Sequence, residues 1–251
     1  MTTVLKLGGS LVTDKERRET LDDDALSAAA DAVADAVGGG GGGAPADLAL
    51  VHGAGSFGHH YAEKHGVSVT EGTTDASAAL EINGSMTTLN RFVLSRLHDR
   101  DVPALPVHPL SAGARDAEAT LELPMQTVRT MLGEGFVPVS HGDVIAHAGS
   151  GATIISGDEV VVRFATGLHA DRVGLCSTVD GVYDADGAVI DRIDAFADVA
   201  DALGGSDATD VTGGMAGKVR TLLDLDAPAY VFGADDLPAF LAGDEPGTRI
   251  D

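Results

Sequence analysis

This sequence contains little cysteine, little lysine and no long apolar run. Its single cysteine, Cys176, excludes an internal disulfide and any cysteine-based zinc cluster, and we expect a small buried residue there. The N-terminus lacks a basic region followed by a long apolar run, and no stretch approaches the roughly 20 apolar residues of a membrane span. These absences predict a soluble, cytoplasmic protein.

Positive charge is also scarce. There are 16 basic against 39 acidic residues, giving a formal net charge of -23, while 44% of the residues are hydrophobic and can build a sizeable core. Such a surface repels nucleic acids and anionic lipid, so neither is an expected partner. The acidic, lysine-poor composition is typical of a halophile's cytoplasmic protein. An anionic substrate could approach only if salt screens the charge or local cations reverse it.

Short apolar runs alternate with helical patterns along the chain. Strands are expected at 3–7, 46–52, 102–109, 136–145 and 227–233, and helices at 22–37, 74–99 and 124–133, with another opening within 210–225. The glycine run 38–43 is expected to form a flexible loop. This alternation predicts an α/β fold around a mostly parallel sheet, with ligands at the carboxyl ends of the strands. The segments 51–56 and 140–144 share a strand followed by His-Gly, which suggests related positions in one sheet.

Two glycine-rich segments follow predicted strands near the N-terminus. In KLGGS (6–10) the backbone N–H groups can approach a phosphate and Lys6 can pair with its charge. In HGAGSFGHH (52–60) three glycines make a loop that could wrap an anion, beside His59 and His60. Each segment alone could equally be an ordinary turn.

Two further segments carry possible phosphate or carboxylate chemistry. GGMAGKV (213–219) is not a Walker A loop, because Thr212 and Val219 stand where that motif needs Gly and Ser/Thr. It remains a glycine-rich helix entry followed by Lys218, although a helix capped by Thr212 would look similar. Asp158 and Asp180 lie in predicted turns, where a carboxylate could orient a lysine, a ribose hydroxyl or hydrated magnesium, or simply make a turn.

The lysines connect these segments. Of the four lysines, Lys6, Lys15 and Lys218 fall on or next to candidate phosphate loops, and only Lys64 does not. Several glycine-rich strand ends, three lysines and no Walker A motif predict a kinase that is not of the P-loop type.

The order KLGGS, HGAGSFGH, SGDE, VDGVY, GGMAGK resembles the amino-acid-kinase superfamily over essentially the whole chain, and GSFGH (55–59) with TDK (13–15) resembles its isopentenyl phosphate kinases. The resemblance implies a three-layer α/β/α sandwich with an open, mainly parallel sheet, as one domain over 1–251. Residues of about 1–150 would form the acceptor-binding half and about 151–251 the nucleotide-binding half. It also implies a homodimer, magnesium, and ATP-dependent phosphorylation of isopentenyl phosphate to the diphosphate in an archaeal mevalonate pathway.

The resemblance also assigns site residues. It places Lys6, Gly8, Gly9, Ser10, Gly55, Asp180, Gly214 and Lys218 on the ATP side, and Ala54, His59 and Gly157 on the isopentenyl phosphate side. Lys15 would stabilise the transferring phosphoryl group and Asp158 would orient the lysines. No residue is assigned as a metal ligand. The chain departs from the usual pattern at Ala54, where the family has Gly, and at His60, where it has Pro.

Alternatives follow from the same fold. A relative could phosphorylate a carboxylate, a carbamate or UMP, or could be a non-catalytic nucleotide-binding regulator. The isoprenyl tail would need an apolar pocket, for which Ile82, Met86 and Ile155 are candidates, although core packing alone would also explain them. Retention of all three lysines favours an enzyme, because a regulator needs affinity but no transition-state charge.

Overall fold

A computed structural model describes residues 1–39, 47–203 and 214–251. Its strands are β1 (Thr2–Leu7), β2 (Asp47–His52), β3 (Ala104–Pro106), β4 (Ala114–Arg115), β5 (Leu121–Glu122), β6 (Val137–His141), β7 (Asp143–His147), β8 (Gly151–Ile155), β9 (Arg172–Ser177), β10 (Arg192–Ile193), β11 (Ala229–Gly233) and β12 (Thr248–Ile250). Its α-helices are α1 (Gly9–Val12), α2 (Asp23–Gly38), α3 (Gly55–His65), α4 (Ala76–His98), α5 (Pro109–Ala112), α6 (Gln126–Gly133), α7 (Gly157–Leu168), α8 (Gly214–Leu223) and α9 (Leu237–Ala242).

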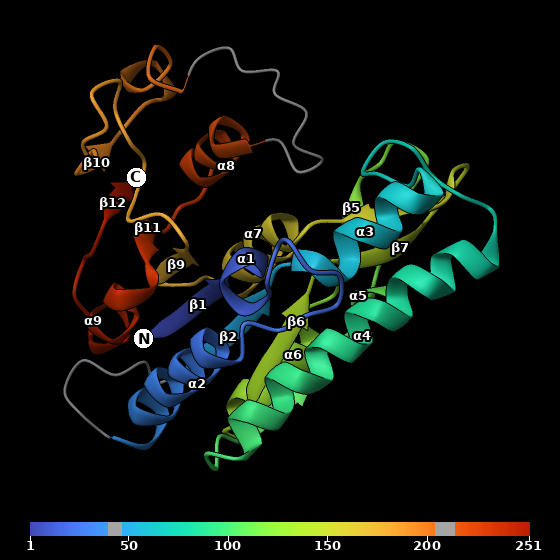
Figure 1. The fold of residues 1–251 in the computed structure, drawn as a ribbon, viewed down its shortest axis with the longest axis horizontal. Coiled ribbons are helices and arrows are strands. Elements are labelled where there is room, and N and C mark those ends of the chain that lie inside the picture. The colour runs from blue at the N-terminus through green and yellow to red at the C-terminus, as the bar shows by residue number, and fades with distance from the viewer. Residues whose placement is uncertain (40–46, 204–213) are drawn as a thin grey trace.

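The main sheet has eight strands in the order β10-β12-β11-β9-β1-β2-β6-β3 (Figure 1). Its pairs are parallel except β11 with β12, which confirms the open, mainly parallel sheet. The strand β1 lies in the middle, between β2 and β9. A central parallel strand is buried on both faces, which explains why Val4 and Leu5 are both 0% exposed.

Helices cover both faces of this sheet. One face packs side chains of α2, α4 and α9, including Leu26, Leu97 and Phe240, against Leu5 and Leu50. The other face carries α6, α7 and α8, whose side chains pack with those of Val4 and Val51. Successive residues of a strand point to opposite faces, so the α/β/α layering follows from these strand sequences.

A second sheet of four strands, β5-β4-β7-β8, was not expected from the sequence. The predicted strand 136–145 is wrong in detail, because it breaks at Gly142 into β6 of the main sheet and β7 of the small one. Gly142 donates its N–H to the His52 carbonyl, 3.2 Å away, and has no side chain to obstruct the neighbouring Gly157 backbone. The small sheet packs Val144 against Tyr61 and Ile82 of α3 and α4.

Several other predicted elements are confirmed with shifted ends. The expected helices 22–37, 74–99 and 124–133 are α2, α4 and α6, and the side chains of Asp22 and Asp75 cap the first two. The expected strand 102–109 shortens to β3, and Pro109 instead begins α5. The loop expected over 38–43 is wrong at Gly38, which is the last residue of α2, and residues 40–43 of the run, like Thr212, lie outside the described residues.

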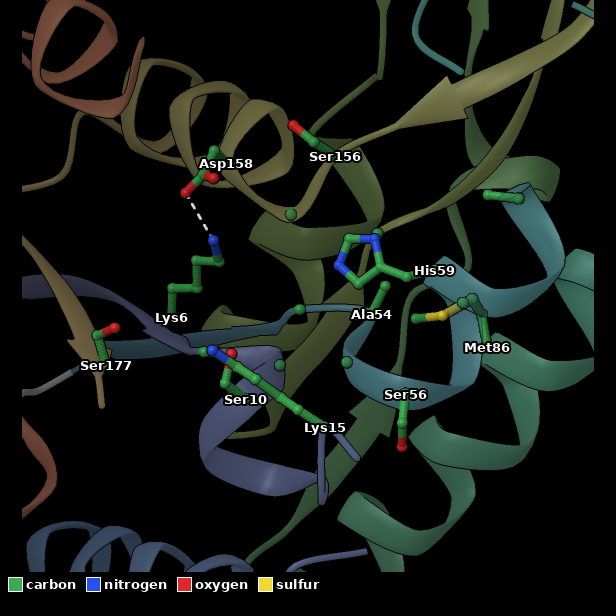
Figure 2. A pocket seen from close by; sticks show the side chains of 18 of the residues that line it. Lys6, Ser10, Lys15, Ala54, Ser56, His59, Met86, Ser156, Asp158 and Ser177 are labelled. Carbon is green, nitrogen blue, oxygen red and sulfur yellow. Dashed lines mark hydrogen bonds and ion pairs between the residues drawn. The ribbon is translucent and has the colours of Figure 1, made fainter. Parts of the chain in front are cut away.

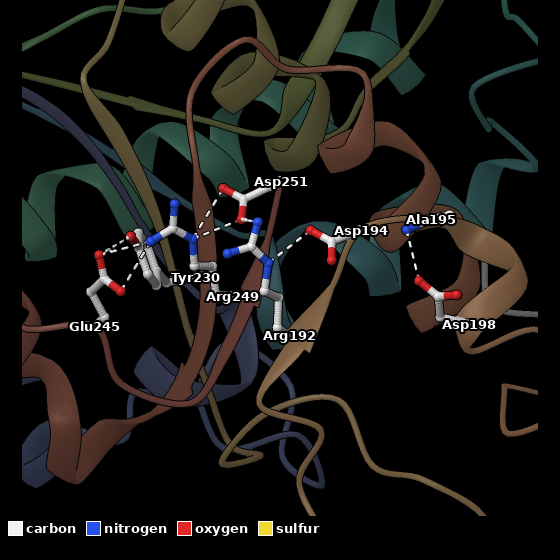
Figure 3. A network of polar contacts seen from close by, with 8 residues as sticks. All are labelled: Arg192, Asp194, Ala195, Asp198, Tyr230, Glu245, Arg249 and Asp251. Carbon is white, nitrogen blue, oxygen red and sulfur yellow. Dashed lines mark hydrogen bonds and ion pairs between the residues drawn. The ribbon is translucent and has the colours of Figure 1, made fainter.

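Polar contacts tie the sheet's β10-β12 edge to the C-terminus (Figure 3). Arg249 binds Asp251 on one side and Glu245 on the other, and Arg192 binds both Asp194 and Asp251. These groups are partly to largely exposed, so each pair contributes little to stability. The described residues contain no helix that is both long and apolar enough to cross a bilayer.

Candidate active site

A cavity of about 860 Å³ opens where the carboxyl ends of the central strands meet. Segments that follow β1, β2, β6, β8 and β9 line it, together with side chains from α3, α4 and α8. Figure 2 shows Lys6, Lys15, His59 and Asp158 arranged around this space. The prediction that glycine-rich strand ends converge on one site is therefore confirmed in its geometry.

Asp158 joins two of the predicted lysines. Lys6 follows Val4 on the face of β1 that is covered by α7, so its ammonium reaches the first turn of that helix. There Lys6 Nζ lies 2.6 Å from Asp158 Oδ1, and Lys218 Nζ from α8 lies 3.8 Å from Asp158 Oδ2. Burial lowers the pKa of Lys6, and the carboxylate of Asp158 opposes that effect. The carboxylate thus holds two cations together that would otherwise repel.

The turn expected at Asp158 is wrong, because this residue lies in helix α7. Ser156 and Glu159 form a capping box there: the Ser156 hydroxyl accepts from the Glu159 N–H, and Glu159 accepts from the Ser156 N–H. The helix N-terminus at Gly157 consequently faces the cavity with first-turn N–H groups that have no intrahelical acceptor. This is a favourable position for a phosphate group.

The segment expected to be a loop at 52–60 is also largely helical. His52 ends β2, Gly53 and Ala54 belong to neither element, and α3 begins at Gly55, with φ of +50°. Backbone φ at Ala54 is -76°, so the methyl group that replaces the family's usual hydrogen is accommodated without strain. A second helix N-terminus therefore points toward the same cavity.

The first two phosphate-loop candidates pack against one another directly. A Cβ on Gly53 would lie 2.5 Å from the Gly9 nitrogen, and one on Gly55 would lie 2.6 Å from the Gly9 oxygen. Such distances exclude any side chain, so the glycines here are required for close backbone approach. Gly8, Gly9, Ser10 and Gly55 accordingly line one continuous wall.

The expected acceptor residues line the same cavity. Ala54, His59 and Gly157 line the cavity, as does His60, next to apolar side chains of Ile82, Met86 and Ile155. Each of these three apolar residues is at most 1% exposed. The cavity therefore combines a cationic, N–H-rich zone with an apolar wall.

Lys15 enters the cavity from an exposed loop between α1 and α2. In Figure 2 its side chain points toward Ser10 and Lys6. Three of the four lysines thus line one cavity, while Lys64 binds Glu81 at the surface. The three lysines that the sequence places next to glycine-rich segments therefore lie around one cavity, and their catalytic roles stay a prediction.

Two predicted nucleotide residues lie outside the cavity lining. Asp180 follows β9 in the chain, is exposed, and lies beside Gly233 at the end of β11. The three residues after β9 that precede it, Ser177, Thr178 and Val179, do line the cavity. Gly214 opens α8 with φ of +59°, and its neighbours Met215 and Lys218 reach the lining. Contact of these two residues with a nucleotide stays a prediction.

Sequence reasoning missed a buried histidine stack behind the loops. His52 and His141 are in register on β2 and β6, with ring centroids 5.3 Å apart. The shared His-Gly pattern signalled this, because both rings bond the carbonyl of the next residue, Gly53 or Gly142. Burial lowers the pKa of His52 to about 4 and that of His141 to about 3, so both rings are neutral.

Asp143 was also missed. It is 2% exposed, lines the cavity, and accepts hydrogen bonds from Asn83 Nδ2 at 2.9 Å and from the Val144 N–H at 2.8 Å. Burial raises the pKa of this carboxyl to about 7. Nothing in the sequence distinguished it from the other aspartates, because its burial arises only when α4 packs on β7.

No group of three His, Cys, Asp or Glu side chains that could hold a metal ion occurs in the described ranges. Kinases commonly bind Mg²⁺ through one or two carboxylates together with the phosphates of the nucleotide. Asp158, the carboxylate beside the lysines, already binds Lys6 and Lys218. Cys176 is buried with its pKa raised to about 12, as expected of a packing residue.

Comparisons with known proteins agree with this architecture. The model of the amino acid kinase family matches residues 1–225. The chain belongs to the amino acid kinase family. Within the family it is 62% identical over 247 residues to isopentenyl phosphate kinase of Haloferax volcanii, covering 98% of this chain and 97% of that one. It is 32% identical over 261 residues to isopentenyl phosphate kinase of Methanocaldococcus jannaschii, covering 100% and 99%.

A solved isopentenyl phosphate kinase structure superposes with a TM-score of 0.82 at 28% identity, covering 100% of both chains. This member of the amino acid kinase family therefore shares the fold and the full length of the isopentenyl phosphate kinases. The resemblance drawn from five short motifs is confirmed.

Proposed function

We propose that this protein transfers the γ-phosphoryl group of ATP to isopentenyl phosphate, forming isopentenyl diphosphate and ADP. The observation that carries the proposal is the composition of the cavity, in which Lys6, Lys15 and Lys218 share one space with His59 and an apolar wall. A phosphate monoester with a short hydrocarbon tail matches both zones. The names of the relatives that match the full chain support the same substrate.

The reaction needs positioning and charge neutralisation from the protein. A phosphate oxygen of the acceptor forms a new bond to the γ-phosphorus of ATP, and the bond from that phosphorus to the bridging oxygen breaks, releasing ADP. The acceptor oxygen is already ionised at neutral pH, so no general base is required. The difficulty is to bring two anions together, for which preorganised cations and N–H groups are suited.

The proposal gives the cavity residues separate roles in binding and catalysis. We propose that Lys6, the N–H groups of Gly9 and Ser10, and Lys218 hold ATP phosphates, with Asp158 fixing the two ammonium groups. Gly8 would let the nucleotide approach the loop closely, while its own N–H donates to the Cys176 carbonyl at 2.9 Å. His59, Ala54 and the N-terminus of α7 at Gly157 would hold the acceptor phosphate, and Lys15 would neutralise charge on the transferring group. Magnesium would come with ATP, held mainly by the nucleotide's own phosphate oxygens.

The remaining expectations belong to this proposal. The residues of about 1–150 would carry the acceptor and those of about 151–251 most of the nucleotide, although Lys6 to Ser10 serve the nucleotide from the first half. A cytoplasmic homodimer in a halophilic host is the setting that the composition and the resemblance favour. The acidic surface would then be screened by salt, which lets anionic substrates approach the cationic cavity.

An acceptor panel tests the function. ADP release is measured with ATP and, in separate reactions, isopentenyl phosphate, dimethylallyl phosphate, glutamate, aspartate, carbamate and UMP. We expect turnover with the isoprenyl phosphates and none above background with the others. Efficient turnover with UMP or a carboxylate would reassign the acceptor, and ATP binding without ADP release from any acceptor would indicate a regulator.

A further inference from the structure

The loop that carries Lys15, residues 13–21, forms a hairpin whose two ends contact each other. Thr13 and Leu21 form an antiparallel bridge at its base, and the Asp14 N–H donates to the Thr20 carbonyl at 3.0 Å. Lys15 lies at the exposed part of this hairpin. These contacts join the two ends of the hairpin, so its contacts with the rest of the protein help to set where the Lys15 ammonium lies.

The first contact joins Thr13 to both phosphate-loop candidates. Its hydroxyl donates to the Gly9 carbonyl at 2.8 Å and accepts from the Ser56 N–H at 2.9 Å. Thr13 is 1% exposed, and loss of its hydroxyl would leave the buried Ser56 N–H without its acceptor, whereas the Gly9 carbonyl would keep the Thr13 N–H at 3.0 Å. Ser56 in turn accepts from the Glu19 N–H through its carbonyl, at 3.3 Å.

The second contact is Tyr61, on the same face of the hairpin. Its hydroxyl donates to Glu19 Oε1 at 3.1 Å and accepts from Arg18, whose guanidinium lies 4.7 Å from the ring centroid. The ring is 6% exposed and packs with Val67, Ile82 and Val144, so it cannot follow the loop if the loop moves. Glu19 has φ of +48°, a conformation that non-glycine residues rarely adopt unless surrounding contacts impose it.

Both contacts lead to α3. This helix begins with Ser56 in its first turn, carries His59 one turn later, and presents Tyr61 to the hairpin. The acceptor-side histidine and the Lys15 loop are thereby fixed to one rigid element. The sequence motifs TDK and GSFGH are physically linked through Thr13 and Ser56, which explains why they occur together in this chain.

We propose that Thr13 and Tyr61 are positioning residues that hold the Lys15 hairpin on α3 and so set where Lys15 meets the transferring phosphoryl group. The inference rests on the proposed function of Lys15. A lysine is a point charge on a flexible four-carbon stem, so the position of its backbone strongly affects how often the ammonium is in place. Displacements of about 1 Å in positioning elements can cost about 100-fold in rate.

The kinetic test uses Tyr61→Phe, Thr13→Val and Thr13→Ser. Tyr61→Phe keeps the ring and removes both hydroxyl bonds. We expect kcat to fall about 10-fold in the first two variants, with the KM for ATP changed less than about 3-fold, and to recover in Thr13→Ser. Matched controls are Tyr230→Phe, whose hydroxyl binds Glu245, and Thr3→Val, whose buried hydroxyl has no partner among the described residues. The controls should retain wild-type kcat.

A double-mutant cycle shows whether the loss of kcat in Tyr61→Phe depends on Lys15. In a Lys15→Ala background, measured by single turnover at high enzyme concentration, Tyr61→Phe should cause no further loss of rate. The same fold-loss in both backgrounds would overturn the proposal, because Tyr61 would then act independently of Lys15.

Hydrogen exchange gives a readout that does not depend on turnover. The Glu19 amide, which donates to Ser56, should exchange at least about 10-fold faster in both Tyr61→Phe and Thr13→Val, while amides of β1 stay protected. Unchanged exchange at Glu19 would overturn the anchoring role even if the kinase function is correct. Faster exchange in a protein that phosphorylates no acceptor would instead retain the anchor and contradict the function of Lys15.

Discussion

Gly9 and Gly55 approach so closely that a Cβ on Gly9 would lie 2.3 Å from the Gly55 nitrogen and 2.8 Å from its Cα. The loop after β1 and the start of α3 are therefore in backbone contact, without intervening side chains. The contact brings the first turns of α1 and α3 to the same cavity wall. The geometry of the wall depends on two residues that are 46 positions apart, as their numbers show.

Substitution of either glycine should disrupt this contact. We expect Gly9→Ala to lower the free energy of unfolding by at least about 2 kcal/mol, because backbone atoms of Gly55 must move to accept the methyl group. The control is Gly84→Ala on the exposed face of α4, where nothing lies within 4 Å and alanine should stabilise by up to about 1 kcal/mol. Denaturant unfolding measures both. Equal stability of Gly9→Ala and wild type would contradict the close approach.

Lys15→Ala should reduce turnover far more than nucleotide affinity. Loss of a preorganised charge at the transferring group typically costs about 100-fold or more in kcat, whereas ATP would still be held by Lys6 and Lys218. Initial-rate kinetics at saturating acceptor separate kcat from the KM for ATP. Lys64→Ala is the matched control, since Lys64 binds Glu81 outside the cavity. Equal losses in kcat and in ATP affinity would rule out a transition-state role for Lys15.

His59→Ala should raise the KM for isopentenyl phosphate. A hydrogen bond to a charged phosphate contributes about 1.5–3 kcal/mol, which corresponds to a rise of roughly 10-fold or more. His60→Ala is compared directly, because His60 also lines the cavity and its ring lies against Tyr61. If the KM rises only in His60→Ala, the acceptor contact belongs to His60.

Asp158→Asn should shift the alkaline limb of the pH profile of kcat/KM to lower pH. The carboxylate of Asp158 raises the pKa of Lys6 against the lowering effect of burial, so its neutralisation leaves a lower pKa. Lys6 then loses its proton at a lower pH than in the wild type, and the ATP phosphates lose the positive charge that pairs with them. Asp23→Asn, in the first turn of α2, serves as the control. An unmoved alkaline limb would show that Lys6 does not govern it.

His141→Asn should make stability less sensitive to acid. The asparagine amide can replace Nδ1 as the donor to the Gly142 carbonyl, but it does not titrate. The folded pKa of His141 is about 3, below its ordinary value near 6.5, so falling pH protonates the unfolded chain first and wild-type stability is lost from about pH 6.5 downward.

Between pH 7.5 and 5, the wild type should therefore lose on the order of 2 kcal/mol more than His141→Asn. Thermal or denaturant unfolding of both proteins at the two pH values provides the measurement. The pH dependence of stability that Asp143 causes has the opposite sign, because its raised pKa lowers the free energy of unfolding as pH rises toward 7. This contribution is the same in both proteins and does not affect their difference. Parallel pH dependence of the two proteins would mean that His141 is not held neutral by burial.

Local patterns predicted the elements whose signals lie within a few residues. The acidic caps Asp22 and Asp75 and the apolar periodicity after them marked α2 and α4 correctly. The pattern failed where glycines are helical: 52–60 was expected to be a loop, yet α3 begins within it at Gly55. Glycine signals backbone freedom, but only the packing of Gly55 on Gly9 and Thr13 decides how that freedom is used.

The sequence by itself determined the α/β class, the family and the grouping of three lysines near glycine-rich strand ends, because alternating apolar runs, short motifs and residue positions are all local features of the chain. Tertiary structure alone decided that Asp158 bridges Lys6 and Lys218, that His52 stacks on His141, and that Thr13 and Tyr61 hold the Lys15 hairpin. Each of these relationships joins residues from elements that are distant in the chain. Their distances, burial and altered pKa values arise only when the sheet brings those elements together.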